Sequence, residues 1–226
     1  TNVIGGSGAD TKGNAGGGVA GVISNVIAQR ISVEGSVSGN RQVGGLIGEI
    51  IHSSSIVMAS AEIAVTNNDT LNNIDFGGAF GKMSKAAPTA ELIYVKGSVD
   101  INTSSTGSNG DAGGLVGSME NKAVVKNSYS RATVVGPDAN GTGGVGGFAG
   151  SVLGDTLQIV NSYSTGQVDH ASATVGITYG GFVGTQSMSA TVTDCFWDRE
   201  TNTASSSAAG TDTTTAAMKN VLTFAL

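Results

Sequence analysis

The sequence is poor in the residues that usually define a compact core or a class of function. Its single cysteine, Cys195, cannot form an intrachain disulfide. Aromatic residues make up only 5% of the chain, and the apolar residues are mostly Val, Ile, Ala and Leu in short runs. This composition favours strands that pack into a thin, stacked interior.

Charged residues are also scarce, at 12% of the chain, and 11 basic against 17 acidic residues give a net charge of −6. This lack of a basic footprint argues against nucleic acid or an anionic membrane surface as a partner. No run approaches the ~18 apolar residues of a membrane span, so we predict no membrane insertion. Abundant Ser, Thr, Asn and Gly are typical of secreted bacterial surface proteins. We therefore expect an extracellular or cell-surface location.

Glycine supplies the dominant pattern. It accounts for 36 of 226 residues against 2 prolines, with no three-residue period, so the chain is not collagen-like. Two glycines, two apolar residues and a glycine recur six times, at intervals of 27, 33, 36, 33 and 34 residues. Such a period indicates a repeat architecture. We predict that the glycine pairs open a strand at a corner, where they adopt positive φ or allow close packing: Gly17, Gly18, Gly44, Gly45, Gly77, Gly78, Gly113, Gly114, Gly146, Gly147, Gly180 and Gly181.

A second strand recurs in each unit. Its last residue is a valine, and small residues alternate with variable charged ones before it, a period of two that places the valines in a core column. These valines are Val37, Val65, Val99, Val134 and Val168. With a further apolar patch before each such strand, every unit has about three strands. We predict an all-β fold, a right-handed parallel β-helix of about six coils with three short strands each.

The predicted domain organisation is simple. Residues 1–16 form a lightly structured entry, and residues 17–226 form a single solenoid. The chain begins at Thr1 without a signal-peptide pattern and ends in an apolar stretch, so we expect a processed subunit or a fragment of a longer protein.

The segment Asn161-Ser162-Tyr163-Ser164, followed by the glycine motif at Gly180, resembles the GLUG-motif repeats of large bacterial surface proteins, and Asn127-Ser128-Tyr129-Ser130 repeats the match. The first two units lack the Asn-Ser-Tyr element. Residues 194–226 are similar to the segment that closes such arrays. The resemblance implies adhesins like filamentous haemagglutinin, or the non-catalytic part of IgA-cleaving metallopeptidases.

These observations favour a non-catalytic structural or adhesive module that acts as a stalk or interaction surface. Its partners would be other copies of the chain or a surface ligand such as a glycan. One alternative is an extracellular filament whose subunits stack end to end. The end-to-end interface would then be Val3, Ile4, Val221, Leu222, Phe224 and Leu226. A second alternative is a polysaccharide-active β-helix enzyme.

Candidate chemistry is sparse, and we predict no catalytic, cofactor-binding or metal site. Glu34 and Glu62 occupy adjacent positions of the aligned strand and are interpreted as solvated acids rather than a glycosidase pair. His52 and His170 are far apart in sequence and form no zinc motif. Cys195 is predicted to be a buried, inert thiol because no base is recognisable near it.

Three further features of the sequence bear on ligand binding. Trp197, the only tryptophan, is predicted to cap the apolar core at the end of the array. Tyr129 and Tyr163 share one column, which favours a stacking ladder over a ligand platform. The segment around Asp10 resembles a calcium-binding nonapeptide poorly, since Lys12 stands where an apolar residue is needed and no neighbouring copy exists.

Overall fold

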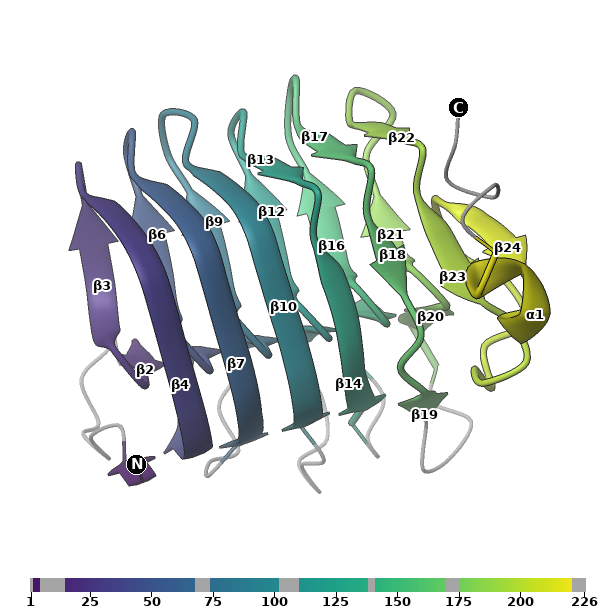
Figure 1. The fold of residues 1–226 in the computed structure, drawn as a ribbon, viewed down its shortest axis with the longest axis horizontal. Helices are drawn as coiled ribbons and strands as arrows, with labels where there is room; N and C mark the ends of the chain where they lie inside the picture. The colour runs from purple at the N-terminus through teal and green to yellow at the C-terminus, as the bar shows by residue number, and fades with distance from the viewer. Residues whose placement is uncertain are drawn as a thin grey trace.

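The structure is a computed structural model, and it describes residues 2–4, 15–67, 74–101, 110–137, 141–169 and 175–220. The chain winds into a parallel β-solenoid whose coils stack along one axis from the N-terminus to the C-terminus (Figure 1). The predicted fold class, an all-β parallel β-helix, is confirmed. Every coil contributes strands to three parallel sheets, which we call sheets A, B and C.

Sheets B and C carry one strand for each glycine motif. Sheet B consists of β2 (Gly16–Gly17), β5 (Gln42–Gly44), β8 (Ile74–Gly77), β11 (Gly110–Gly113), β15 (Gly143–Gly146) and β20 (Ile177–Gly180). Sheet C consists of β3 (Ala20–Ser24), β6 (Ile47–Ile51), β9 (Phe80–Ser84), β12 (Val116–Glu120), β16 (Ala149–Leu153) and β21 (Val183–Gln186).

Sheet A forms the third side. Its long strands are β4 (Ile27–Gly39), β7 (Ser55–Asn67), β10 (Thr89–Asp100) and β14 (Tyr129–Val135). The remaining strands are short: β1 (Asn2–Ile4), β13 (Val124–Lys126), β17 (Gln158–Val160), β18 (Tyr163–Ser164), β19 (Val168–Asp169), β22 (Thr191–Thr193), β23 (Phe196–Asp198) and β24 (Thr211–Thr213). The helix α1 (Thr215–Met218) follows β24.

The number of coils is smaller than predicted. Sheets B and C each have six strands, but sheet A keeps a long strand only in the coils of β4, β7, β10 and β14. Beyond β14 this side breaks into short pieces. The stack therefore amounts to about four turns rather than about six. The long strands also merge two segments that the sequence pattern separates, because one bent strand covers both.

The aligned valines form the predicted core column. Val37 pairs in register with Val65, Val65 with Val99, and Val99 with Val134. All of these valines are fully buried. The stacked rings of Phe148 and Phe182, 4.6 Å apart, extend the same interior between neighbouring coils. Each coil thus buries its apolar face against the next one, as a solenoid requires.

The glycine pairs lie at the corner between sheets B and C, not at the start of a strand. The first glycine ends a sheet B strand, and the sheet C strand begins three residues later. Positive φ occurs at other glycines among the described residues, such as Gly97 and Gly143. Close approach is therefore the reason for the pairs: a Cβ on Gly114 would lie 2.2 Å from the carbonyl oxygen of Gly147.

In each coil, one residue with a positive φ bends the backbone of sheet A. This column holds Arg30, Met58, Leu92, Asn127, Asn161 and Asp194, with φ between 49° and 58°. The Asn of the Asn-Ser-Tyr element belongs to this column, since Asn tolerates the left-handed region better than other side chains. The first units lack the element, yet their chain bends at the same place, so they belong to the same structural repeat.

The serine that follows the bend completes it. Ser128 and Ser162 are buried, and each hydroxyl donates to the carbonyl oxygen two residues earlier, at 2.7 and 2.9 Å. The same hydroxyls accept backbone N–H groups from the preceding coil, Ile93 at 3.1 Å and Ser128 at 3.2 Å. The motif thereby satisfies the backbone groups that the bend removes from the ladder.

Residues 194–220, which we call the closing segment, cover the last coil. The backbone N–H of Gly181 donates to the carbonyl oxygen of Ser206 at 3.0 Å. The Ser207 hydroxyl accepts from the N–H groups of Phe182 and Val183 at 3.1 and 2.8 Å. Figure 1 shows this segment folded over the C-terminal end of the stack. Its backbone takes the place of a further coil.

Two predictions fall on or beside residues outside the described ranges. Residues 5–14, with the calcium prediction at Asp10, and the apolar end with Val221, Leu222, Phe224 and Leu226 lie outside them. Val3 and Ile4 lie in β1, the edge strand of sheet A, where Val3 pairs with Val37.

Candidate functional site

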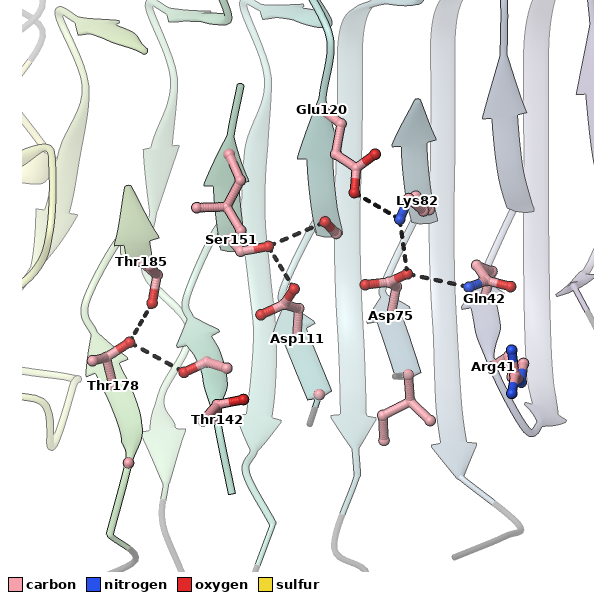
Figure 2. Close-up of a pocket in the computed structure, with 16 residues that line it drawn as sticks. Arg41, Gln42, Asp75, Lys82, Asp111, Glu120, Thr142, Ser151, Thr178 and Thr185 are labelled. Atoms are coloured by element: carbon pink, nitrogen blue, oxygen red, sulfur yellow. Dashed lines mark hydrogen bonds and ion pairs between the residues drawn. The ribbon is translucent and has the colours of Figure 1, made fainter. Parts of the chain in front are cut away.

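The outer side of the corner between sheets B and C carries two facing columns of mostly polar residues. The sheet B column lies two residues before each glycine pair: Gln42, Asp75, Asp111, Gly144 and Thr178. The sheet C column lies five residues after the first glycine: Glu49, Lys82, Ser118, Ser151 and Thr185. Because the coils stack in register, these positions form a continuous groove along the axis (Figure 2).

The two sheets approach closely at the floor of the groove. A Cβ on Gly117 would lie 2.5 Å from both the backbone nitrogen of Phe76 and the carbonyl oxygen of Gly81. Only glycine permits such contact between backbones. The resulting cavity has a volume of about 650 Å³, within the range of ligand-binding clefts. Ser118 and Ser151 at its floor are buried.

An ion-pair network occupies the middle of the groove. Lys82 Nζ lies 2.8 Å from Glu120 Oε1 and 3.7 Å from Asp75 Oδ2. Gln42 Nε2 donates to the same Asp75 oxygen at 3.3 Å. One lysine therefore faces two carboxylates from neighbouring coils.

A second network surrounds the next acid. The Ser151 hydroxyl donates to Asp111 Oδ2 at 2.6 Å, and the backbone N–H of Gly144 donates to Asp111 Oδ1 at 2.8 Å. The Ser118 hydroxyl lies 3.1 Å from that of Ser151. Asp111 pairs in register with Asp75 on the adjacent strand, so two acids stand one coil apart.

Burial perturbs both acids. It raises the pKa of Asp75 to about 7, although Lys82 opposes the shift. Burial also raises the pKa of Asp111, against the hydrogen bonds from Ser151 and Gly144. Burial lowers the pKa of Lys82, but Asp75 and Glu120 outweigh it, so its pKa is raised. Asp75 therefore exchanges its proton near neutral pH, while Lys82 stays charged.

The two ends of the groove differ. At the C-terminal end, the hydroxyl of Thr178 bonds to that of Thr185 and donates to the carbonyl oxygen of Gly143 at 3.2 Å. At the N-terminal end, Arg41 lines the groove, and its Nε is buried without a hydrogen-bond partner among the described residues. A buried donor left unpaired is costly, and a bound acceptor would satisfy it.

The predicted acidic pair lies elsewhere, on the outer face of sheet A. Glu34 and Glu62 pair in register, as predicted, and both are exposed. Lys96 of the following coil forms an ion pair with Glu62. The acids whose pKa is raised by burial are Asp75 and Asp111 in the groove.

The predicted tyrosine ladder is confirmed. The rings of Tyr129 and Tyr163 stack with centroids 4.9 Å apart and planes 7° apart. Tyr94 extends the ladder by one coil, at 4.5 Å and 36° from Tyr129. Phe196 continues the column in the strand register.

Cys195 and Trp197 are buried, as predicted. Cys195 stands in the column of the bend serines, is buried, and its Sγ lies 3.1 Å from the carbonyl oxygen of Thr193, as the serine hydroxyls do in earlier coils. Burial raises the pKa of its thiol to about 12. Trp197 is 4% exposed and packs where a Cβ on Gly181 would lie, which places it over the end of the core.

The histidines form no metal centre among the described residues. His52 shares a 2.9 Å hydrogen bond with Ser24 at the surface, and His170 lies outside the described ranges. In those ranges no group of three His, Cys, Asp or Glu side chains is placed to hold a metal ion. In the same part of the chain, no helix has both the length and the hydropathy to cross a bilayer.

Sequence reasoning missed the groove. The residues that line it differ in chemistry from coil to coil, so no single residue type repeats at these positions in every unit. The available signal was positional: from the motif at Gly44 onward, the residues two before and five after the first glycine are polar in every motif, with Gly144 as the exception. The glycine motif therefore marks the groove as well as the corner.

Comparison with known proteins leaves the family open. No model of a protein family matches the chain, and no curated protein matches it. The resemblance to GLUG-motif repeats stays a prediction, and the function must be argued from the fold and the groove.

Proposed function

We propose that the chain is a non-catalytic structural module of a secreted bacterial surface protein, acting as a stalk that presents an interaction surface. The observation that carries the proposal is the difference between the two ends of the stack. The closing segment occupies the hydrogen-bonding groups of the last coil, at Gly181 and Val183. A module whose last coil is covered, while described apolar side chains of its first coil stay exposed, is suited to terminate an extended array.

The N-terminal end supports this reading. Large apolar side chains of the first coil stay exposed: Val19 by 52%, Val22 by 48% and Ile27 by 75%. In the following coils the positions in register with Val22 are polar, Glu49 and then Lys82. An apolar side chain at the first position favours cover by another layer of chain.

End-to-end assembly into a filament is the second candidate, and the same exposed edge favours it. A filament, however, needs an exposed interaction surface at both ends of the subunit, because only a head-to-tail contact propagates. The described part of the closing segment covers the C-terminal end. Copies that meet through the N-terminal edge alone would form pairs instead of fibres.

Electron microscopy of the purified 226-residue chain separates these candidates. The stalk proposal predicts isolated short rods, with no growth in length as the protein concentration rises. Continuous fibres would favour the filament and would overturn the proposal. A variant with Val22→Glu and Ile27→Glu is the control, since it removes the exposed apolar side chains without touching the closing segment.

A further inference from the structure

We infer that the groove between sheets B and C binds an extended, hydroxyl-rich oligosaccharide, lying along the solenoid axis over the columns of Asp75 and Lys82. The inference names a ligand for the interaction surface in the proposed function. The stalk role would stand without it, because the stalk depends on the coil stack and its ends.

The groove is lined by both hydrogen-bond donors and hydrogen-bond acceptors. Carboxylates at Asp75, Asp111 and Glu120 accept hydrogen bonds, while Lys82 and Arg41 donate them. Serine and threonine hydroxyls between them do both. A ligand facing this mixture must offer donors and acceptors in close alternation, and sugar hydroxyls meet that requirement.

The spacing of the coils along the groove is close to the length of a sugar unit. Stacked strands lie ~4.8 Å apart, so each coil repeats its polar pair at that interval along the groove. An extended β-1,4-linked polysaccharide advances by a similar length for each sugar ring. Each sugar can therefore lie beside one coil, with alternate sugars presenting the same ring face, and the cavity of about 650 Å³ is large enough for more than one ring.

Among the described residues, an unpaired donor lies at the N-terminal end of the groove. Arg41 Nε is buried without a partner among the described residues. The Arg41 backbone carbonyl is already used, since it accepts from the N–H of Asp75 at 2.7 Å. Because this nitrogen is buried, a rotation of the Arg41 side chain toward the groove would bring it to a ring or hydroxyl oxygen of a bound sugar, which would pair it.

Other ligand classes fit less well. Asp111 and Glu120 would repel the phosphates of a nucleic acid. A metal ion finds no cluster of three suitable ligands in the described ranges, and Glu120 and Asp75 already share Lys82. The ion pairs and the buried serines would leave an apolar ligand facing polar groups that it cannot satisfy.

Titration of the 15N-labelled chain with four linear hexasaccharides tests the inference by NMR: cellohexaose, chitohexaose, xylohexaose and mannohexaose. We expect saturable shifts of the Asp111, Gly144 and Ser151 amides with at least one of them. Arg41→Gln and Asp111→Asn should each weaken that binding about tenfold, the effect of losing a hydrogen bond to a charged group.

Glu62→Gln is the matched control, because Glu62 is an exposed acid on sheet A, away from the groove. It should leave the affinity unchanged. Thermal unfolding of each variant shows whether the fold is intact, and Arg41→Gln keeps the test decisive if Asp111→Asn unfolds. Absence of saturable shifts with every hexasaccharide at millimolar concentration would overturn the inference. So would binding that maps to the Tyr129 ladder or is insensitive to both groove variants.

Discussion

Ser151 donates a 2.6 Å hydrogen bond to Asp111, and this bond joins sheet C of one coil to sheet B of the coil before it. The two residues are 40 positions apart in the sequence, one five after the first glycine of its motif and the other two before its own. The bond thus links neighbouring coils on the outside of the corner, at the floor of the groove.

Removing this bond should destabilise the stack. Ser151→Ala leaves the buried Asp111 with one fewer donor, and we expect a loss of about 1–2 kcal/mol in the free energy of unfolding. Urea unfolding monitored by circular dichroism measures it. Ser60→Ala is the control, because the Ser60 hydroxyl also reaches a neighbouring coil, at Ser32, but on the exposed face. Equal effects of the two substitutions would contradict a special role for the groove floor.

Leu92→Asn should stabilise the protein. Leu92 has a φ of 58°, an unfavourable backbone conformation for leucine. Its side chain is 48% exposed, so little apolar burial offsets this strain. A left-handed conformation costs an ordinary residue roughly 1–2 kcal/mol, and Asn bears a smaller share of it. We expect a gain of up to about 1 kcal/mol, seen as a higher midpoint in thermal unfolding. Glu91→Asn, one position away, should give no gain; a lower midpoint for Leu92→Asn would refute this account of the bend.

Gly114→Val should disrupt the corner. A Cβ there would lie 2.2 Å from the carbonyl oxygen of Gly147 and 2.3 Å from the Ser130 hydroxyl, and the backbone of the next coil cannot yield cheaply. Overpacking a well-formed interior typically costs about 1–3 kcal/mol, and contact with backbone puts this site at or above the top of that range. Thr133→Val on the outer face of sheet A is the control. A normal melting temperature for Gly114→Val would be incompatible with the close approach of the coils.

Stability should fall as pH rises through the range where Asp75 titrates. Its pKa in the folded state is raised to about 7, mainly by burial, above the ordinary value of 3.8. Between about pH 4 and pH 7 the unfolded state has released the proton that the folded state retains, so unfolding becomes easier by roughly 4 kcal/mol. Above pH 7 the penalty stays constant, and below pH 4 it vanishes.

Asp75→Asn removes this dependence because the amide does not titrate. Asp111 contributes a slope of the same sign, and Lys82 contributes none in this window because its raised pKa matters only in alkali. Urea unfolding at about pH 4.5, 6 and 7.5 covers the start, middle and end of this window. The free energy of unfolding should therefore fall less steeply with pH in Asp75→Asn than in the wild type. Parallel curves for the wild type and Asp75→Asn would exclude Asp75 as the source.

The architecture follows from the sequence because solenoid coils repeat in register. The glycine period and the valine column identify the parallel stack, and the register of Val37 with Val65 is as predicted. The pattern misplaces local details, since period-two alternation does not reveal a bend. The apolar patch predicted before the valine strand is Val22-Ile23 in the first unit and Ile56-Val57 in the second. Val22 lies in sheet C, however, and the residue in register with Ile56 is Ala28.

The groove could not be predicted because it depends on the angle between two sheets. That angle is set by backbone contacts at glycines such as Gly117, which the sequence shows only as a missing side chain.

The absence of turnover is the point on which the proposal of a non-catalytic module depends most directly. Asp75 and Asp111 stand one coil apart in a polysaccharide-sized groove, the place where hydrolysis would occur if the chain were an enzyme. Incubation of the purified chain with a panel of plant, fungal and bacterial polysaccharides, followed by quantification of reducing ends and unsaturated products, should show none above a protein-free blank. Product release that Asp75→Asn and Asp111→Asn abolish, in variants that remain folded, would contradict the account and make the groove an active site.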